Sequence, residues 1–123
     1  MADGLSVTVA NAALSTIIGT DANNVQLHTG APGSAGTANV SSTTTRPSVT
    51  WNSPSAGSVS ASNQPAWTNW AGTNGEVDTD ISFWSASVAG TFGLSMQLNA
   101  SVTMDTGDSL TLTSITISIP TAS

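Results

Sequence analysis

The sequence contains no cysteine and no lysine, and Arg46 is its only arginine. Without cysteine there is no disulfide, no thiolate metal ligand and no cysteine nucleophile, so stability must come from packing and backbone pairing. Nucleic acids and anionic membranes are bound through several Lys or Arg side chains, and we therefore expect neither partner. The missing lysine also excludes a phosphate-binding loop of the Gly-Lys type, and we expect no cofactor.

Charge and long apolar runs are scarce as well. Only 7% of the residues are charged, with a net charge of -6, and no apolar run approaches the roughly 18 residues of a membrane span. In place of charge the chain carries 20 Ser and 19 Thr, which predicts a hydroxyl-rich surface. Low charge limits repulsion between crowded copies, and a short chain leaves much of its surface for partners, so we expect a homo-oligomer.

Alternation of apolar with small or polar residues is the clearest pattern. It runs through residues 92–104, and its apolar members are Phe92, Leu94, Met96, Leu98, Ala100, Val102 and Met104. A period of two predicts one long half-buried strand, or two strands joined by a bend. Shorter patterns predict strands at 25–28, 49–51 and 59–61. A further strand beginning at Ile81 either buries both faces or contains a bulge.

A second apolar run changes phase. Its members are Leu110 and Leu112 in one phase and Ile115, Ile117 and Ile119 in the other. A β-bulge near residues 113–114 would return all of them to one face. Residues 105–108, Asp-Thr-Gly-Asp, lie between the two runs and predict a hairpin turn.

Helical spacing occurs once, near the N-terminus. The apolar stripe consists of Ala10, Ala13, Leu14, Ile17 and Ile18. This stripe predicts a helix at about residues 10–18, with Gly19 as a natural C-terminal stop. Leu5, Val7 and Val9 alternate instead, so a short strand leading into the helix competes with one longer helix.

Short strands separated by turns, with one helical segment, predict a mainly β fold. We expect a β-sandwich or a jelly-roll-like barrel with one short N-terminal helix. Residues 1–123 would form a single β domain, with the β-sandwich at about 24–120. The Gly-, Pro-, Ser- and Thr-rich stretches 30–48 and 52–66 are typical of long loops rather than of a domain boundary.

His28 is the only histidine, and general acid–base catalysis would depend on it. The sequence contains no Gly-x-Ser-x-Gly motif, the turn that exposes a nucleophilic serine in many hydrolases. We therefore expect no enzyme. The favoured interpretation is that His28 ends a strand and hydrogen-bonds the turn that follows at residues 29–33.

Glu76, Asp78 and Asp80 form an acidic cluster that could hold a hard cation such as calcium. Calcium loops bring more ligands at a fixed spacing, so the favoured interpretation is a solvated acidic turn that begins at residues 74–75. We expect no metal site.

Four tryptophans are many for this length. Trp67 and Trp70 lie in the turn-rich stretch 65–72, and we expect at least one of their rings near the surface, where it could contact another subunit or a glycan. Trp51 and Trp84 are predicted to pack in the core.

Several segments resemble one family of phage proteins. Residues 27–33 read Leu-His-Thr-Gly-Ala-Pro-Gly, and the resemblance continues through 36–40, Arg46, Ile81–Ala86, Gly90–Phe92 and Gly107-Asp108. It is to small bacteriophage virion proteins of the Leu-His-Thr-Gly-x-Pro-Gly type, with tail-fibre-like and capsid-decoration-like members. Ala31 stands where the family commonly has Asp, and the Trp67–Trp70 stretch is less typical. The resemblance favours the helix at 10–18.

The resemblance implies a non-enzymatic structural protein of a bacteriophage virion, assembled in the host cytoplasm. The N-terminus lacks the basic region of a secretory signal, in keeping with that location. Our leading prediction is a capsid decoration or accessory protein that packs in many copies against the major capsid protein or other virion proteins. The alternative is a tail or tail-fibre component that contacts host surface glycans.

Overall fold

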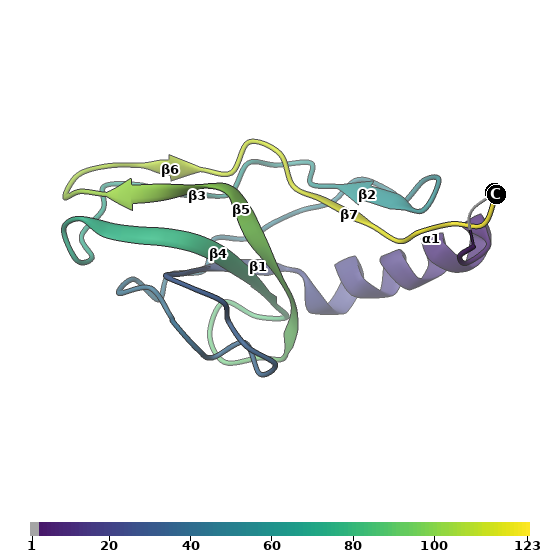
Figure 1. Ribbon diagram of the computed structural model, residues 1–123, viewed down its shortest axis with the longest axis horizontal. Coiled ribbons are helices and arrows are strands. Elements are labelled where there is room, and N and C mark those ends of the chain that lie inside the picture. The colour runs from purple at the N-terminus through teal and green to yellow at the C-terminus, as the bar shows by residue number, and fades with distance from the viewer. Residues whose placement is uncertain (1–2) are drawn as a thin grey trace.

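The computed structural model describes residues 3–123. Its elements are α1 (Val7–Thr16), the π-helical turn η1 (Ile17–Asp21), β1 (Asn24–His28), β2 (Ser58–Ser60), β3 (Ala66–Trp67), β4 (Glu76–Trp84), β5 (Phe92–Met104), β6 (Leu110–Thr111) and β7 (Thr116–Ser118). Figure 1 shows these strands with one helix at the N-terminal end. The prediction of a mainly β fold with one short N-terminal helix is confirmed.

Helix α1 begins earlier than predicted and does not stop at Gly19. The side chain of Ser6 caps its N-terminus by accepting a hydrogen bond of 3.2 Å from the Val9 amide. Ala10 and Leu14 on one face are fully buried. The chain then passes through Gly19 as the π-helical turn η1, so the predicted stop is wrong.

A three-stranded antiparallel sheet in the order β1–β4–β5 forms the most regular part of the molecule. The pairing of β1 with β4 runs without a shift from Asn24 opposite Trp84 to His28 opposite Asp80. The predicted long strand is β5, and it is bent (Figure 1). Asp80 faces Gln97 but Asp78 faces Val102, so β5 carries extra residues between these pairs and bends there.

A second region, which we call the ribbon, consists of residues 57–67 and 110–119. β2 pairs with β7 and β3 pairs with β6, both antiparallel. Between these short pairs, hydrogen bonds of 2.9 Å join the Leu112 amide to the Pro65 carbonyl and the Ala61 amide to the Ile115 carbonyl. The strand predicted at 59–61 is therefore present as β2, whereas residues 49–51 make only an isolated bridge from Trp51 to Ala61.

The ribbon corrects two predictions about the chain after residue 104. The turn at 105–108 is present, but β5 pairs with β4 while β6 pairs with β3, so the turn does not close a hairpin. The phase change near 113–114 is a break between β6 and β7 rather than a bulge within one strand. The two halves of the run pair with different strands, which allows each to turn its own apolar residues inward.

The main core lies between the sheet and the ribbon. The sheet contributes Val25, Leu27, Ile81 and Phe83, and the ribbon contributes Trp67, Leu112 and Ile115. A smaller cluster of Leu14, Val59 and Ile117 fixes α1 to the ribbon. The layers thus resemble a loose sandwich, and residues 3–123 form no closed barrel. Among those residues no helix is long and apolar enough to cross a membrane.

Candidate functional site

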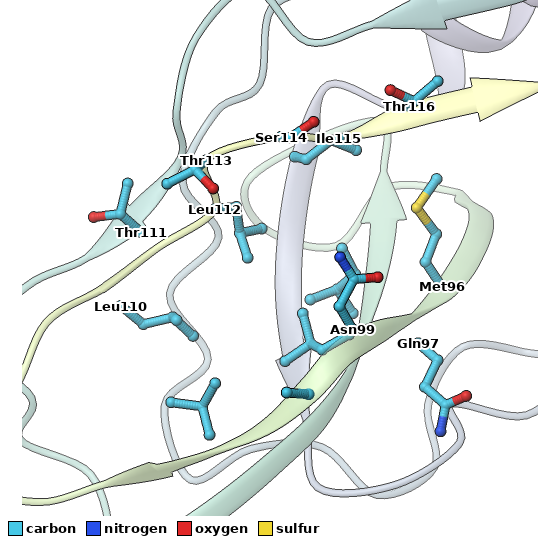
Figure 2. A pocket seen from close by; sticks show the side chains of 14 residues that line it. Met96, Gln97, Asn99, Leu110, Thr111, Leu112, Thr113, Ser114, Ile115 and Thr116 are labelled. Atoms are coloured by element: carbon cyan, nitrogen blue, oxygen red, sulfur yellow. The ribbon is translucent and has the colours of Figure 1, made fainter.

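A groove of about 430 Å³ separates β5 from the C-terminal strand of the ribbon. Figure 2 shows its walls, which come from β5 on one side and from residues 110–116 on the other. The β5 wall consists of Met96, Gln97, Leu98, Asn99, Ala100 and Val102, and Ile81 of β4 also lines the groove. We call this hollow the groove.

Both walls of the groove are unpaired strand edges. β5 is the last strand of its sheet and pairs only with β4, while the other wall pairs only with residues 57–67. Within residues 3–123 no backbone hydrogen bond joins β5 to residues 110–116. Unpaired edges offer amide and carbonyl groups to an incoming strand, and natural proteins usually protect them with charge, proline or a covering loop. β5 contains neither a charged residue nor a proline.

The chemistry of the groove is uncharged. None of the 14 residues that line it is ionisable. Apolar side chains such as Leu98 and Leu110 are only half-buried. The amides of Gln97 and Asn99 make no side-chain hydrogen bond to any other described residue. Such a surface can form hydrogen bonds and bury apolar groups, and its residue types provide no acid–base group.

His28 lies in the sheet opposite Asp80, but its two ring nitrogens contact a carbonyl and a hydroxyl rather than a carboxylate. Its Nδ1 lies 2.9 Å from the Ala38 carbonyl oxygen and its Nε2 lies 2.6 Å from the Ser82 hydroxyl. Trp84 donates from its indole nitrogen to the same hydroxyl at 2.8 Å. Burial lowers the pKa of His28, against the opposing effects of the Ala38 carbonyl and Asp80. The imidazole therefore stays neutral, donating from Nδ1 to Ala38 and accepting from Ser82.

This arrangement gives His28 a structural part. It ends β1 as predicted, but its partners are Ala38 and Ser82 rather than the turn at residues 29–33, so that part of the prediction is wrong. His28 and Ser82 are both fully buried. A substrate cannot reach a fully buried serine hydroxyl, and the geometry therefore offers no Ser-His catalytic pair.

Two carboxylates of the acidic cluster, Glu76 and Asp78, lie in different surroundings. Glu76 accepts hydrogen bonds from the Ser41 hydroxyl at 2.5 Å and the Ser42 amide at 3.0 Å. Asp78 is fully buried, and neither of its oxygens has a hydrogen-bond partner among the described residues. The prediction of a solvated acidic turn is therefore wrong for Asp78. No group of three His, Cys, Asp or Glu in residues 3–123 is placed to hold a metal ion.

These surroundings determine which of the two carboxyl groups, Glu76 or Asp78, is protonated. Burial, and then the neighbouring Glu76 carboxylate, raise the pKa of Asp78 to about 7. Burial also pushes the pKa of Glu76 upward, but the hydrogen bonds from Ser41 and Ser42 and the adjacent Asp78 carboxyl outweigh it and leave that pKa lowered. The pair thus holds one proton on Asp78 over much of the acidic and neutral range.

Trp67 and Trp70 are not surface rings. Their exposed fractions are 4% and 3%, so the expectation that at least one ring lies near the surface is wrong. Their indole nitrogens donate to the carbonyls of Thr45 and Thr73 at 2.9 and 3.0 Å. They lie beside a second hollow of about 320 Å³, whose other lining residues are Ser42, Thr43, Thr45, Ala66, Thr68, Asn69, Ala71 and Gly72. The predicted glycan or interface contacts of the two tryptophans stay predictions.

Arg46, the only residue of the Lys and Arg type in the sequence, has a structural position. Its guanidinium lies 4.1 Å from the centre of the Trp84 ring. It donates to the Gln26 side chain at 3.1 Å and to the carbonyls of Ala86 and Ala89 at 3.2 and 2.7 Å. Arg46 thereby ties the loop after β4 to β1, and the predicted core tryptophan Trp84 forms part of the same contact.

A comparison with known protein families gives one match. A family model described as "Podophage GP4 fiber I protein gp80" matches residues 2–120. No curated protein matches the chain. The matched region includes both walls of the groove, His28 and the hollow beside Trp67.

Proposed function

Because this chain belongs to the family of podophage GP4 fiber I protein gp80, we propose that it is a structural subunit of the phage tail fibre. The family match over residues 2–120 is the observation that carries the proposal. Family membership makes the chain a bacteriophage structural protein, and proteins of this class are not expected to be enzymes. The alternative predicted from the sequence, a tail or fibre component, is better supported than capsid decoration.

The subunit would work by packing against other virion proteins. Its groove carries two unpaired strand edges and no charge, which suits contact with another uncharged protein surface. A net charge of -6 is spread over few residues elsewhere, so neighbouring copies can approach at uncharged surfaces with little repulsion. Such contacts require neither a cofactor nor a reaction.

A second role, contact with a host surface glycan, is supported by the hollow beside Trp67. Thr68 and Asn69 line it, and neither side chain makes a hydrogen bond to another described residue. Asn69 has φ of 51°, a left-handed conformation that Asn adopts more readily than most residues. Hydroxyl and amide groups around a buried aromatic floor can bond sugar hydroxyls without a charged partner.

Removal of a single hydroxyl group from the hollow tests the glycan role. Thr68→Val keeps the side-chain shape and removes the hydroxyl from the hollow, and Thr103→Val makes the same change on an exposed part of β5 outside it. Binding of the purified protein to host cell-surface polysaccharide would weaken for the first variant and stay unchanged for the second. Equal binding by both variants would contradict a glycan site in this hollow.

The position in the virion tests the proposal itself. Cryo-electron microscopy of intact particles, combined with gold-labelled antibody against this chain, locates it directly. Density that fits the bent sheet and the ribbon along a fibre is the expected result. Density repeated over the capsid shell would contradict the fibre proposal and establish the decoration role that the sequence first suggested.

A further inference from the structure

Residues 5–9, Leu-Ser-Val-Thr-Val, have an unusual surface. Leu5, Val7 and Val9 are 43%, 44% and 52% exposed, which makes them three of the six large apolar side chains that the described residues expose. The segment carries no charge. Exposed aliphatic side chains gathered in one short segment are typical of a surface that a partner covers.

The sequence of this segment is compatible with a strand as well as with a helix. Its alternating pattern and β-branched residues favour a strand, yet Val7–Val9 form the first turn of α1. That turn has no acidic residue to favour its N-terminal dipole. It is held by the Ser6 cap and by a hydrogen bond of 2.9 Å from the Ala10 amide to the Ser6 carbonyl.

The fully buried side chains of the helix lie after this turn. Ala10 and Leu14 are fully buried, and the Asn11 side chain accepts a hydrogen bond of 2.9 Å from the Gly57 amide. Leu5 is linked to the C-terminal segment by two backbone hydrogen bonds, to Pro120 and from Ala122. Release of residues 5–9 therefore breaks these backbone hydrogen bonds and the Ser6 cap, but it leaves the buried side-chain contacts from Ala10 onward in place.

We propose that residues 5–9 of one copy extend and enter the groove of a second copy as an added strand. In an extended chain Leu5, Val7 and Val9 point to one face, where they can cover the half-buried apolar side chains of the groove. The backbone of the segment pairs with the two free edges. At about 3.3 Å per residue, five residues are shorter than the seven-residue wall at 110–116 and fit along it.

Charge favours this occupant. Groove and segment are both uncharged, so two copies that each carry a net charge of -6 can meet there without burying a carboxylate. Because the segment and the groove are different surfaces, the contact is heterologous, and repetition extends a row of subunits unless it closes into a ring. Figure 1 shows the first turn of α1 beside the C-terminus, at the far end of the molecule from β6. This inference rests on the proposed fibre function.

Cysteine cross-linking tests the contact, because the natural chain has no cysteine of its own. A Val7→Cys protein is mixed with an Asn99→Cys protein under mild oxidation, and mixed disulfide dimers are expected. In the matched control, Val88→Cys replaces Val7→Cys at a side chain that is 81% exposed and lies outside segment and groove. No enrichment of the Val7–Asn99 dimer over the control would overturn the proposal.

A charge placed in either surface gives an independent measurement. Self-association, measured by sedimentation of the full-length chain, should weaken more than about tenfold for Val7→Asp and for Asn99→Asp, since each buries an unpaired charge. Val88→Asp should associate like the natural chain. Circular dichroism and thermal unfolding confirm that each variant is folded. A natural chain that stays monomeric, or variants that associate normally, would overturn the proposal.

The virion distinguishes this inference from the function on which it rests. Fibre density with an empty groove would overturn strand addition alone. Density on the capsid shell would instead overturn the proposed fibre function, whatever the sedimentation shows.

Discussion

The sheet and the ribbon have contrasting constructions. β1 and β4 pair over five residues without a shift, and their polar residues His28 and Ser82 are buried and hydrogen-bonded. The ribbon is held by pairs of two and three residues, and one of its edges faces the groove unpaired. The sheet thus has the longer uninterrupted pairing, whereas the ribbon and β5 carry the unpaired edges at which we propose that a partner binds.

The largest expected effect on the free energy of unfolding separates the main core from the small cluster under α1. Phe83 is fully buried in the main core and packs 5.9 Å from the Trp51 ring, measured between ring centres. Phe83→Ala should lower the free energy of unfolding by about 3–5 kcal/mol. Ile117→Ala in the small cluster under α1 should cost about 2 kcal/mol, at the low end for such changes. Chemical denaturation measures both, and a larger loss for Ile117→Ala would reverse the comparison.

A smaller effect is expected from the buried hydrogen bonds that link His28, Ser82 and Trp84. Ser82→Ala removes the hydroxyl that donates to His28 and accepts from Trp84, which leaves two buried nitrogens without partners. We expect a loss of about 2 kcal/mol in the free energy of unfolding. Ser95→Ala, at the exposed position opposite Ser82 on β5, is the matched control and should change it by less than about 0.5 kcal/mol. Equal losses in the free energy of unfolding for the two variants would show that these buried hydrogen bonds do not stabilise the fold.

Asp78 predicts how the stability of the sheet depends on pH. Its pKa rises from an ordinary 3.8 to about 7 in the folded chain. Between these values the folded state keeps a proton that the unfolded state has lost, so this carboxyl lowers stability as pH rises, and the loss levels off above about 7. Asp78→Asn should therefore raise the free energy of unfolding at about pH 8 by about 4 kcal/mol, with little gain near pH 4.

Thermal unfolding over that pH range measures the effect of Asp78→Asn. The variant and the natural chain should converge as the solution becomes acidic, because both then hold a neutral side chain at this position. A constant difference at every pH would mean that the carboxyl is not protonated in the fold, and the sheet would then contain a buried charge.

The smallest expected effect on the single chain comes from the groove. Gln97→Glu keeps the shape of the side chain and adds a charge to an exposed position of β5 that makes no side-chain hydrogen bond among the described residues. The new carboxylate lies opposite Asp80, so the free energy of unfolding should fall by no more than about 1 kcal/mol, while self-association weakens. A large loss of stability in the monomer would show that the groove belongs to the core rather than to an assembly surface.

Much of the sheet could be predicted from the sequence because its signals are local. The alternation at residues 92–104 identified β5, and the apolar stripe identified α1 to within a few residues. The pairing partners could not be predicted, since the phase change near 113–114 is equally compatible with a bulge and with a break. In the structure the run is broken, and its two halves pair with different strands, β6 with β3 and β7 with β2.

The candidate site was harder to predict for the same reason. The groove exists because two strand edges remain unpaired, and no residue pattern marks the absence of a partner. Trp67 and Trp70 lie in a stretch rich in turn residues, yet both rings are buried in the main core, which is built from residues far apart in the sequence. The one signal that could have pointed to the groove was the uncharged, proline-free length of β5, which is unusual for an edge strand.

Hydrogen exchange tests the division between sheet and ribbon most directly. Amide exchange is followed by mass spectrometry at a concentration where the chain is monomeric and again where it associates. This division predicts slow exchange in β4 under both conditions, and slower exchange in residues 5–9, β5 and 110–116 only after association. Unchanged exchange in these three segments, or slowing confined to other parts of the chain, would contradict it.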